Sequence, residues 1–243
     1  MILINGNCLD EIKTIPDNSI DLILADPPYG VTKCEWDKII HFDELWPDLH
    51  RVAKANAAIL IFGIEPFSSK IRISNLKNYR YDIVYEKPNA TGFLNANRQP
   101  LRAHENISVF YKKQPVYNPQ KTTGHTRKRS SRRFVATEIY GKVLKVSNYN
   151  STDRYPRSVL KFSSDKQKKS RHPTQKPLEL LRYLIQTYSN DGDTVLDFVM
   201  GSGSTGAASL SLNRKFVGIE LDERYFCEAQ KWLQSIKHKK ETD

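Results

Sequence analysis

The apolar run Ile20–Ala25 and the two prolines that follow it place the strongest constraint on the fold. The run is short, rich in Ile and Leu, and bounded by Asn18-Ser19 and by Pro27-Pro28, which is typical of a buried central strand. The proline pair can neither continue a sheet ladder nor enter a helix interior, so the chain must leave the sheet here. Open α/β sheets bind ligands at the carboxyl ends of their strands.

Short apolar runs alternate with helical patterns along most of the chain, which predicts an α/β fold with a doubly wound, mostly parallel sheet. A short helix or turn is expected at 10–15, and polar, irregular chain at 33–37 and 87–104. The amphipathic pattern at 41–53 predicts a helix with Pro47 inside it. Further strands are expected at 57–62, 81–86, 105–111, 194–198 and 215–219, and further helices at 66–76, 178–188, 204–212 and 222–236.

The stretch Asp26-Pro27-Pro28-Tyr29 would present a carboxylate, a carbonyl and an aromatic ring at the ligand-binding edge. The exocyclic amine of a nucleobase has two N–H bonds, which the Asp26 carboxylate and the Pro27 carbonyl could accept together. Tyr29 could stack on a base drawn out of a duplex. Asp and Pro are also ordinary turn residues, so a simple turn is the alternative interpretation.

The net charge of +11 is concentrated in one segment. Residues 112–171 carry seventeen Lys and Arg against three acidic residues, whereas the rest of the chain is slightly acidic. A basic segment with interleaved aromatics on a near-neutral body favours a phosphate-contacting lobe, and a solvated basic loop is the alternative. The densest basic run supplies the candidate DNA contacts Arg127, Lys128, Arg129, Arg132 and Arg133.

The cysteines Cys8, Cys34 and Cys227 are odd in number and far apart, which favours reduced thiols over a disulfide framework or a metal site. No signal peptide or membrane-spanning run is evident, so a cytoplasmic protein is expected. No cysteine follows a proline, so the chain does not resemble the families that use a Pro-Cys nucleophile to methylate the ring carbon of cytosine.

A second motif, from Val195 to Gly206, has the order of a strand, a glycine turn and a helix start. Glu220 ends the next predicted strand, where a carboxylate can accept from two ribose hydroxyls. Gly201, Gly203 and Gly206 also match the dinucleotide fingerprint, so a nicotinamide-dependent dehydrogenase is a rival. Too little chain follows Gly206 for the second nucleotide-binding half and substrate domain of such an enzyme.

A third motif, His172-Pro173-Thr174-Gln175-Lys176-Pro177, directly precedes the helix that leads into the glycine strand. Alone, it is typical of a helix start, with Pro177 suited to the first turn. The three motifs together, in the order catalytic loop, basic lobe, His-Pro-Thr-Gln-Lys-Pro element and glycine loop, resemble the permuted beta class of S-adenosylmethionine-dependent DNA amino-methyltransferases. Nearly the whole chain is covered.

The resemblance implies a Rossmann-like, circularly permuted methyltransferase fold with an inserted DNA-recognition lobe. It divides the chain into a catalytic half at 1–111, the lobe at 112–171 and a cofactor-binding half at 172–243. The catalytic residues would be Asp26, Pro27, Pro28 and Tyr29. The segments 95–98 and 102–105 also look like that family, without assigned roles.

The resemblance also implies a cofactor site for S-adenosyl-L-methionine. Glu220 would bind its ribose, and His172, Thr174 and Lys176 would close over its methionine carboxylate. Asn7 stands where relatives usually have Asp, so it offers a hydrogen bond to the adenine ring without a charge. The remaining implied cofactor contacts are Cys8, Asp26, Asp197, Phe198, Gly201, Ser202, Gly203, Ser204 and Thr205.

The implied activity is methylation of the N6 amino group of adenine in duplex DNA, by base flipping and direct transfer. N4-cytosine methylation is the nearest alternative; Ser often takes the Asp26 position in that group. RNA as the substrate and a non-catalytic nucleic-acid-binding protein are more distant alternatives. The expected partner is DNA in the nucleoid, with a possible restriction endonuclease partner, and the protein would act as a monomer or homodimer.

Overall fold

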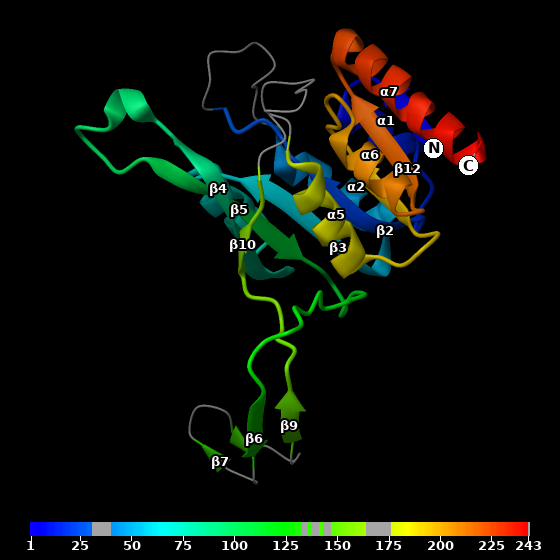
Figure 1. Cartoon of the computed structure of the whole chain (residues 1–243). Helices are drawn as coiled ribbons and strands as arrows, with labels where there is room; N and C mark the ends of the chain where they lie inside the picture. The colour runs from blue at the N-terminus through cyan, green and yellow to red at the C-terminus, as the bar shows by residue number, and fades with distance from the viewer. Residues whose placement is uncertain (31–39, 133–135, 138–140, 143–146, 164–175, 243) are drawn as a thin grey trace. The chain divides into compact units, whose positions relative to one another are not determined.

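An eight-stranded sheet forms the centre of the fold in the computed structural model, which describes residues 1–30, 40–132, 136–137, 141–142, 147–163 and 176–242 (Figure 1). The strand order is β1-β12-β11-β2-β3-β5-β4-β10. The strands are β1 (Ile2–Asn5), β2 (Ile20–Ala25), β3 (Ala53–Gly63), β4 (Tyr79–Thr91), β5 (Arg102–Phe110), β10 (Val159–Lys161), β11 (Thr194–Asp197) and β12 (Lys215–Glu220).

The sheet is mostly parallel, as the sequence predicted, and β5 is its antiparallel strand. β5 pairs antiparallel with both β3 and β4, whereas the other neighbouring strands pair in parallel. The amino end of β5 therefore lies at the same edge as the carboxyl ends of the other strands. The chain leaves β2 and β11, which are neighbours, toward opposite sides of the sheet, so the binding edge of an open α/β sheet is expected between them.

Helices cover both faces of the sheet because alternate side chains of its buried strands point to opposite sides. Ile23 and Ala25 pack in one apolar cluster, and Leu22 and Leu24 pack in another. The first cluster includes residues of α1 (Cys8–Glu11), η1 (Ile12–Thr14), α2 (Phe42–Val52) and α3 (Phe67–Ser74). The second includes residues of α5 (Leu178–Tyr188), α6 (Ser204–Ser211) and α7 (Glu223–Thr242).

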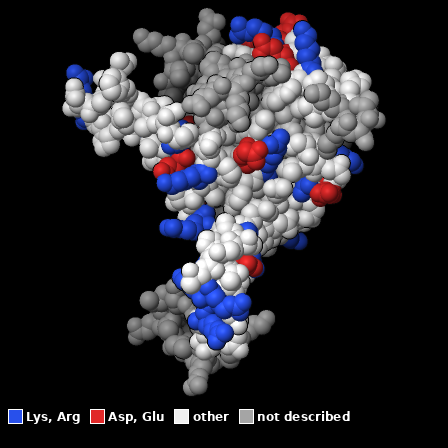
Figure 2. Space-filling model, in the orientation of Figure 1, with Lys and Arg blue, Asp and Glu red and all other residues white. Residues whose placement is uncertain are grey.

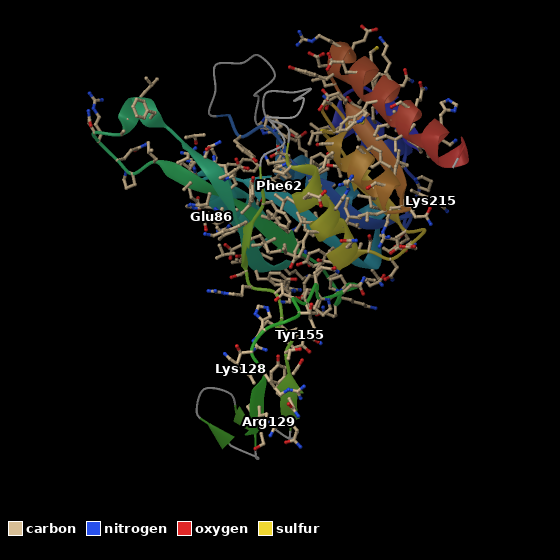
Figure 3. The ribbon with its side chains drawn as sticks, in the orientation of Figure 1. Phe62, Glu86, Lys128, Arg129, Tyr155 and Lys215 are labelled. Atoms are coloured by element: carbon tan, nitrogen blue, oxygen red, sulfur yellow. The ribbon has the colours of Figure 1, made fainter. Side chains whose placement is uncertain are left out.

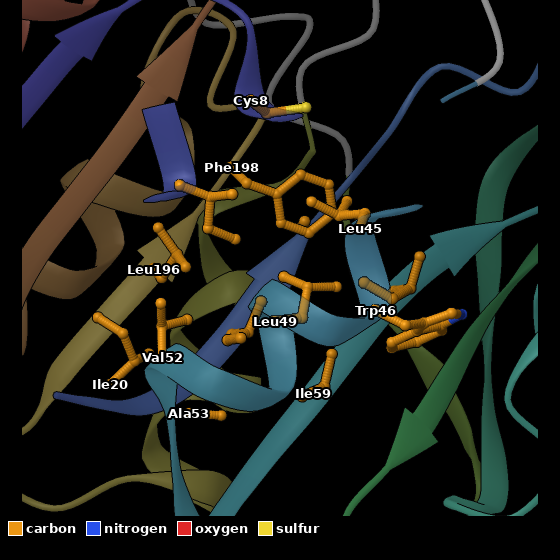
Figure 4. Packing of buried hydrophobic residues seen from close by; sticks show 14 of the residues in the cluster. Cys8, Ile20, Leu45, Trp46, Leu49, Val52, Ala53, Ile59, Leu196 and Phe198 are labelled. Carbon is orange, nitrogen blue, oxygen red and sulfur yellow. The ribbon is translucent and has the colours of Figure 1, made fainter. Parts of the chain in front are cut away.

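Helix α2 shows how the amphipathic pattern builds this core. Its buried residues Leu45, Trp46, Leu49 and Val52 face the sheet and pack in the same cluster as Phe198 and Ile59 (Figure 4). The helix runs from Phe42 to Val52 with Pro47 inside it. The sequence pattern therefore placed this helix correctly.

The structure differs from the sequence prediction at β1, β4 and β5. The short segment Ile2–Asn5 was not predicted as a strand, but it pairs with β12 at the sheet edge. Residues 87–104 were expected to be irregular, yet β4 continues to Thr91 and β5 begins at Arg102, with a 3-10 turn, η2 (Phe93–Asn95), between them. These strand ends were missed because a paired segment with both faces exposed carries no buried apolar alternation.

The basic segment 112–171 contributes to two compact units. Pro119–Arg157 forms a unit of its own, inside the boundaries expected for the lobe. It contains β6 (Lys128–Arg132) paired with β9 (Ser147–Ser151), and β7 (Ala136–Thr137) paired with β8 (Gly141–Lys142). Strand β10 belongs to the main unit, because it pairs with β4.

Candidate active site and nucleic-acid interface

Four neighbouring strands deliver polar side chains to one edge of the sheet. Asn7 follows β1, Glu220 ends β12, Asp197 ends β11 and Asp26 follows β2. These strands are adjacent in the order β1-β12-β11-β2 and run parallel. The structure therefore brings together Asn7 and residues of two motifs that are far apart in the sequence.

Asp26 is held by two side chains at the end of β2. Its Oδ1 accepts a hydrogen bond from the Tyr29 hydroxyl, and its Oδ2 lies 2.5 Å from Lys176 Nζ. Pro27 is buried directly after it, and the chain turns at Gly30, whose φ is +67°. The Asp-Pro-Pro-Tyr stretch is thus a rigid turn that fixes the direction of one carboxylate.

The ring of Tyr29 is half-buried in an aromatic surrounding. Its centroid lies 5.3 Å from that of Phe67 and 5.8 Å from Lys176 Nζ. Lys176 Nζ also lies 5.1 Å from the centroid of Phe62, at the end of β3. The packing leaves the Tyr29 ring supported from the protein side and restricts its movement.

Lys176 links the third motif to the catalytic loop. It is buried just before α5, 2.5 Å from Asp26 Oδ2 and 3.1 Å from Glu105 Oε2. The family resemblance implies that this ammonium faces the methionine carboxylate of the cofactor. In the structure it bridges two carboxylates of the protein itself.

Glu105 is a site residue for which sequence reasoning gave no role. It lies in β5, and its carboxylate also pairs with Lys87 of β4 at 3.5 Å. Because β5 is antiparallel, its amino-terminal part reaches the same edge as Asp26. An acid directly before the apolar end of a strand was the available signal, but strand direction was needed to interpret it.

The charges of this cluster shift one another. Burial raises the pKa of Asp26, the Lys176 charge lowers it, and the Glu105 charge raises it; the net shift is upward. Burial would lower the pKa of Lys176, but Asp26 and Glu105 outweigh it and raise that pKa. Burial would likewise raise the pKa of Glu105, but Lys176 and Lys87 lower it. The lysine is therefore held as a cation between two acids.

Glu220 organises the glycine turn after β11. Its Oε2 accepts from the Gly201 backbone N–H at 2.8 Å, and its Oε1 accepts from the Asp222 N–H at 2.9 Å. The Met200 N–H also donates to the Ile219 carbonyl at 2.9 Å. The carboxylate that was assigned to the ribose thus also ties the end of β12 to the glycine turn.

The three glycines of this motif have different surroundings. Gly201 has a φ of +52°, and a methyl group added to it would meet no atom within 4 Å. A methyl group on Gly203 would lie 3.1 Å from Ala229 Cβ, and one on Gly206 would lie 2.7 Å from Phe216 Cε1. Gly201 therefore leaves open space where a ligand can approach the backbone, whereas Gly203 and Gly206 allow close packing of α6.

Asp197 ends β11 as a buried carboxyl group. Its Oδ1 accepts from the Val199 N–H at 3.1 Å, and burial raises its pKa to about 7. Phe198 is fully buried in the core, 6.3 Å from the Phe42 ring. Ser202 and Thr205 are buried, and Ser204 begins α6.

Asn7 and Cys8 contribute in unequal ways to the local structure. Asn7 is the N-cap of α1, since its side-chain oxygen accepts from the Leu9 N–H at 3.0 Å. Cys8 is buried in the core cluster, and burial raises the pKa of its thiol to about 11. This thiol is therefore protonated and packs as an apolar group at neutral pH.

Several predicted residues lie outside the described part of the chain. These are His172 and Thr174 of the third motif, Arg133 of the basic run, Cys34, and the irregular stretch 33–37. Cys8 and Cys227 are free thiols. Among the described residues, no group of three or more His, Cys, Asp or Glu side chains is arranged to hold a metal ion.

The basic run lies on the paired strands β6 and β9 of the smaller unit. Arg127, Lys128 and Arg129 are exposed, and Lys and Arg side chains gather over these two strands (Figure 2; Lys128 and Arg129 are labelled in Figure 3). Because side chains alternate along β6, Lys128 and Arg129 point to opposite faces. Arg132 ends the strand, paired with Ser147.

Arg154 has a structural role in the same unit. It donates to the backbone carbonyls of Ser151 and Asp153, at 3.2 and 2.7 Å, and to that of Thr126. Its guanidinium therefore ties together the chain segments that flank β6 and β9. In the basic run, the exposed Arg127 donates to Asn150 Oδ1 at 3.3 Å.

Within the described residues, no helix is long and apolar enough to cross a membrane.

Comparison with known sequences gives a consistent result. The family model described as DNA methylase, of the N6/N4 methyltransferases, matches residues 20–231. The type II methyltransferase M.HinfI of Haemophilus influenzae is 31% identical over 97% of this chain and 68% of its own. The DNA adenine methyltransferase YhdJ of Escherichia coli (strain K12) is 30% identical over 92% of this chain and 79% of its own.

Solved structures agree with the fold. The complex of M1.HpyAVI with SAM has a TM-score of 0.68 at 26% identity and covers 96% of this chain and 98% of its own. The cytosine-N4-specific PvuII DNA methyltransferase also has a TM-score of 0.68, at 15% identity, covering 96% of this chain and 90% of its own. The second likeness supports the fold alone.

Proposed function

Since the chain belongs to the N6/N4 family of DNA methylases, we propose that it methylates the N6 amino group of adenine in duplex DNA, with S-adenosylmethionine as the methyl donor. The observation that carries the proposal is the placement of Asp26. A half-buried carboxylate, followed by a buried proline, lies at the point where the strand order of the sheet reverses.

Asp26 and Pro27 can orient the target amino group without covalent catalysis. Pro27 has no N–H, so the turn offers its carbonyl as an acceptor and no competing donor. Two acceptors, the Asp26 carboxylate and the Pro27 carbonyl, can hold the two N–H bonds of one exocyclic amine. This favours a more tetrahedral nitrogen, whose lone pair is then available for direct attack.

The residues around Gly201 fit the methyl donor. Gly201 leaves open space beside its backbone, and the Glu220 carboxylate, which lies 2.8 Å from the Gly201 N–H, would accept from the ribose hydroxyls. Asp197 and Lys176 would complete the polar contacts from β11 and from the start of α5. When bound, S-adenosylmethionine supplies an electrophilic methyl group on a sulfonium.

Tyr29 supports the target base. Base chemistry in a duplex requires the base to leave the stack, and an aromatic ring can then replace part of the lost stacking. The Tyr29 ring is packed on Phe67 and tied through its hydroxyl to Asp26. The residue that would stack on the base is therefore fixed relative to the residue that would accept from its amine.

Adenine is preferred over cytosine for two reasons. Asp26 stands where N4-cytosine methyltransferases often have Ser, and the relative YhdJ is named as an adenine methyltransferase. The geometry of Asp26 and Pro27 suits either exocyclic amine. N4-methylcytosine is therefore the second outcome that the test must distinguish.

The test is incubation of the protein with unmethylated duplex DNA and labelled S-adenosylmethionine, followed by nuclease digestion and mass spectrometry of the nucleosides. N6-methyladenine is the expected product. Detection of N4-methylcytosine would show that cytosine is the target base. The absence of any methylated nucleoside would contradict the proposal.

The test variant and its control change one Asp on either side of β2. Asp26→Ala should abolish transfer while binding of DNA persists. Asp17→Ala, an exposed carboxylate before β2 that pairs with Arg51, should remain active, since exposed ion pairs contribute little to stability. Substantial activity in Asp26→Ala would exclude the proposed role of that residue.

A further inference from the structure

The paired strands β4 and β5 extend beyond the body of the sheet as a ribbon, which we define as residues 87–104. Every residue from Pro88 to His104 is exposed, and the ribbon projects from the sheet with η2 at its tip (Figure 1). Glu86 pairs with His104 at the base of the ribbon and Thr91 pairs with Arg102 farther out, with a register shift between the two pairs. A paired segment that buries neither face contributes little to the core, so its shape needs another explanation.

The tip of the ribbon has a defined backbone. The Asn95 N–H donates to the Gly92 carbonyl at 2.9 Å, and the Ala96 N–H donates to the Phe93 carbonyl at 3.0 Å. The Arg98 N–H in turn donates to the Asn95 carbonyl at 2.9 Å. Two consecutive turns therefore hold the tip in one shape while its side chains point outward.

Two adjacent apolar side chains are exposed at this tip. Phe93 is 81% exposed and Leu94 is 99% exposed. A single exposed apolar residue is normal, but an aromatic and a leucine side by side at the end of a projecting ribbon are typical of a contact surface. Neither side chain belongs to the apolar clusters of the core, and neither is among the residues described around Asp26.

The polar side chains of the ribbon have the chemistry of nucleic-acid contacts. Arg98 and Arg102 are basic and exposed, Lys87 is paired with Glu105, and residues 87–104 contain no Asp or Glu. The remaining polar side chains include four amides, which with Arg are the groups that bind base edges and phosphates. The amides are Asn89, Asn95, Asn97 and Gln99.

The ribbon begins at the active site. Glu105, the residue that follows it in β5, lies 3.1 Å from Lys176 Nζ, which lies 2.5 Å from Asp26. On β4, Glu86 (labelled in Figure 3) is the last residue before the ribbon and pairs with His104. The strand between Glu105 and Arg102 spans about 10 Å, or about three base-pair steps. A duplex whose target base is held at Asp26 therefore lies within reach of Arg102, and the ribbon continues outward from Arg102 to the tip.

We propose that this ribbon is a second DNA-binding element, separate from the basic unit, and that Phe93 and Leu94 insert into the base stack within a few base-pair steps of the flipped base. Apolar side chains inserted between base steps stabilise unstacked DNA, and Arg98 and Arg102 would hold the adjacent phosphates. The inference rests on the proposed function for its substrate, duplex DNA, and names the residues that open the stack.

The first test uses Phe93→Ala with Leu94→Ala and asks whether stack opening is affected. On a duplex carrying the mapped target site, kcat/KM should fall at least tenfold, as expected when an aromatic contact to a base is lost. On the same duplex with a mismatch at the target base, most of the activity should return, because a mismatched base is easier to extrude. Fluorescence of 2-aminopurine at the target position should report reduced flipping.

The matched control uses exposed apolar residues at the other end of β4. Ile73 and Leu76 are 74% and 67% exposed and precede that strand. Ile73→Ala with Leu76→Ala should behave as wild type on both duplexes. Unfolding temperature and binding of S-adenosylmethionine by calorimetry should be unchanged in both double variants.

The second test measures phosphate contacts directly. Arg98→Gln with Arg102→Gln should make the slope of log affinity against log salt shallower by about 2 in fluorescence anisotropy with a labelled duplex, since each lost phosphate contact removes about 0.9. The control Lys70→Gln with Lys77→Gln removes two exposed lysines near α3 and should leave the slope unchanged.

Three results would overturn the proposal. The Phe93 and Leu94 variant could match wild type on the matched duplex, or lose activity equally on matched and mismatched duplexes. It could also change the oligomeric state in sedimentation without changing DNA affinity, which would identify a second copy of the chain as the partner of the tip. Failure of the proposed function can be distinguished from failure of this inference. In the first case the wild-type protein transfers no methyl group, while the anisotropy measurement still shows whether the ribbon binds DNA.

Discussion

Lys176 Nζ lies 2.5 Å from Asp26 Oδ2, so a buried ammonium occupies one of the acceptor oxygens that a target amine would use. Glu105 shares the same ammonium at 3.1 Å. Two carboxylates thus compete for one lysine, and the proton affinity of Asp26 depends on both neighbours. In the proposed mechanism an ionised Asp26 accepts from the amine, so this competition would set the pH at which activity begins.

Removal of the lysine charge should move the acidic limb of the pH profile upward. The Lys176 charge lowers the pKa of Asp26, which burial raises. In Lys176→Met the Asp26 pKa therefore rises further, and kcat/KM should decline at a higher pH than in wild type. The profile should be measured at saturating cofactor, because Lys176 is also a proposed cofactor contact.

Glu105→Gln is the opposite test of the same relationship. The Glu105 charge raises the pKa of Asp26, and its loss leaves Lys176 to Asp26 alone. The acidic limb should therefore move to lower pH than in wild type. If both variants shifted the limb in the same direction, the limb would report a group other than Asp26.

Gly201→Ala and Gly206→Ala should separate cofactor binding from stability. Gly201 faces open space at a φ of +52°, so alanine costs about 1 kcal/mol in backbone strain and places a methyl group where the cofactor would approach. We expect at least a tenfold loss of affinity for S-adenosylmethionine in calorimetry. The free energy of unfolding should fall only slightly.

Gly206→Ala should give the reverse result. The added methyl group would lie 2.7 Å from Phe216 and 2.8 Å from Leu233, and overpacking of this kind costs about 1–3 kcal/mol. The better helix propensity of alanine offsets part of that cost. Urea denaturation should show the larger loss here, and equal effects of the two variants in both measurements would argue against different roles.

Glu220→Ala should weaken both the glycine turn and cofactor binding. The Gly201 and Asp222 N–H groups would lose their acceptors, and an unsatisfied, partly buried donor costs about 1–3 kcal/mol. Glu220→Gln keeps one acceptor oxygen, so it should retain more stability while still losing affinity for S-adenosylmethionine. Glu228→Ala, an exposed position on α7, is the control and should change neither quantity.

The sequence predicted the sheet, most helices and the strand ends that carry Asp26, Asp197 and Glu220, because buried strands and amphipathic helices have distinct apolar periods. It did not predict the role of Glu105, because that role depends on the antiparallel direction of β5. Local pattern cannot give strand direction, which is set by pairing between segments far apart in the chain.

The exposed elements were the least predictable. The ribbon at 87–104 and the hairpin β6–β9 bury few apolar residues, so no periodic pattern marks them. The roles of Gly203 and Gly206 were also open in the sequence, where all three glycines of the motif matched one fingerprint. Only the packing of α6 against Ala229 and Phe216 distinguishes them from Gly201.

Asp197 should make the stability of the protein depend on pH. Burial raises the pKa of this carboxyl group to about 7 in the folded state, against about 3.9 in the unfolded chain. Between these values the folded state holds a proton that the unfolded state has released, so the free energy of unfolding decreases as pH rises from about 4 to 7. At 1.36 kcal/mol per pKa unit, the decrease attributable to Asp197 is at most about 4 kcal/mol.

Asp197→Asn removes this ionisation and keeps an oxygen to accept from the Val199 N–H. Its free energy of unfolding, measured in urea at pH 5, 6, 7 and 8, should therefore decline less with pH than that of wild type. Relative to wild type, the variant should be more stable at pH 8 than at pH 5. The exposed control Asp17→Asn should follow the wild-type profile, and a parallel profile for Asp197→Asn would show that Asp197 is already ionised throughout this range.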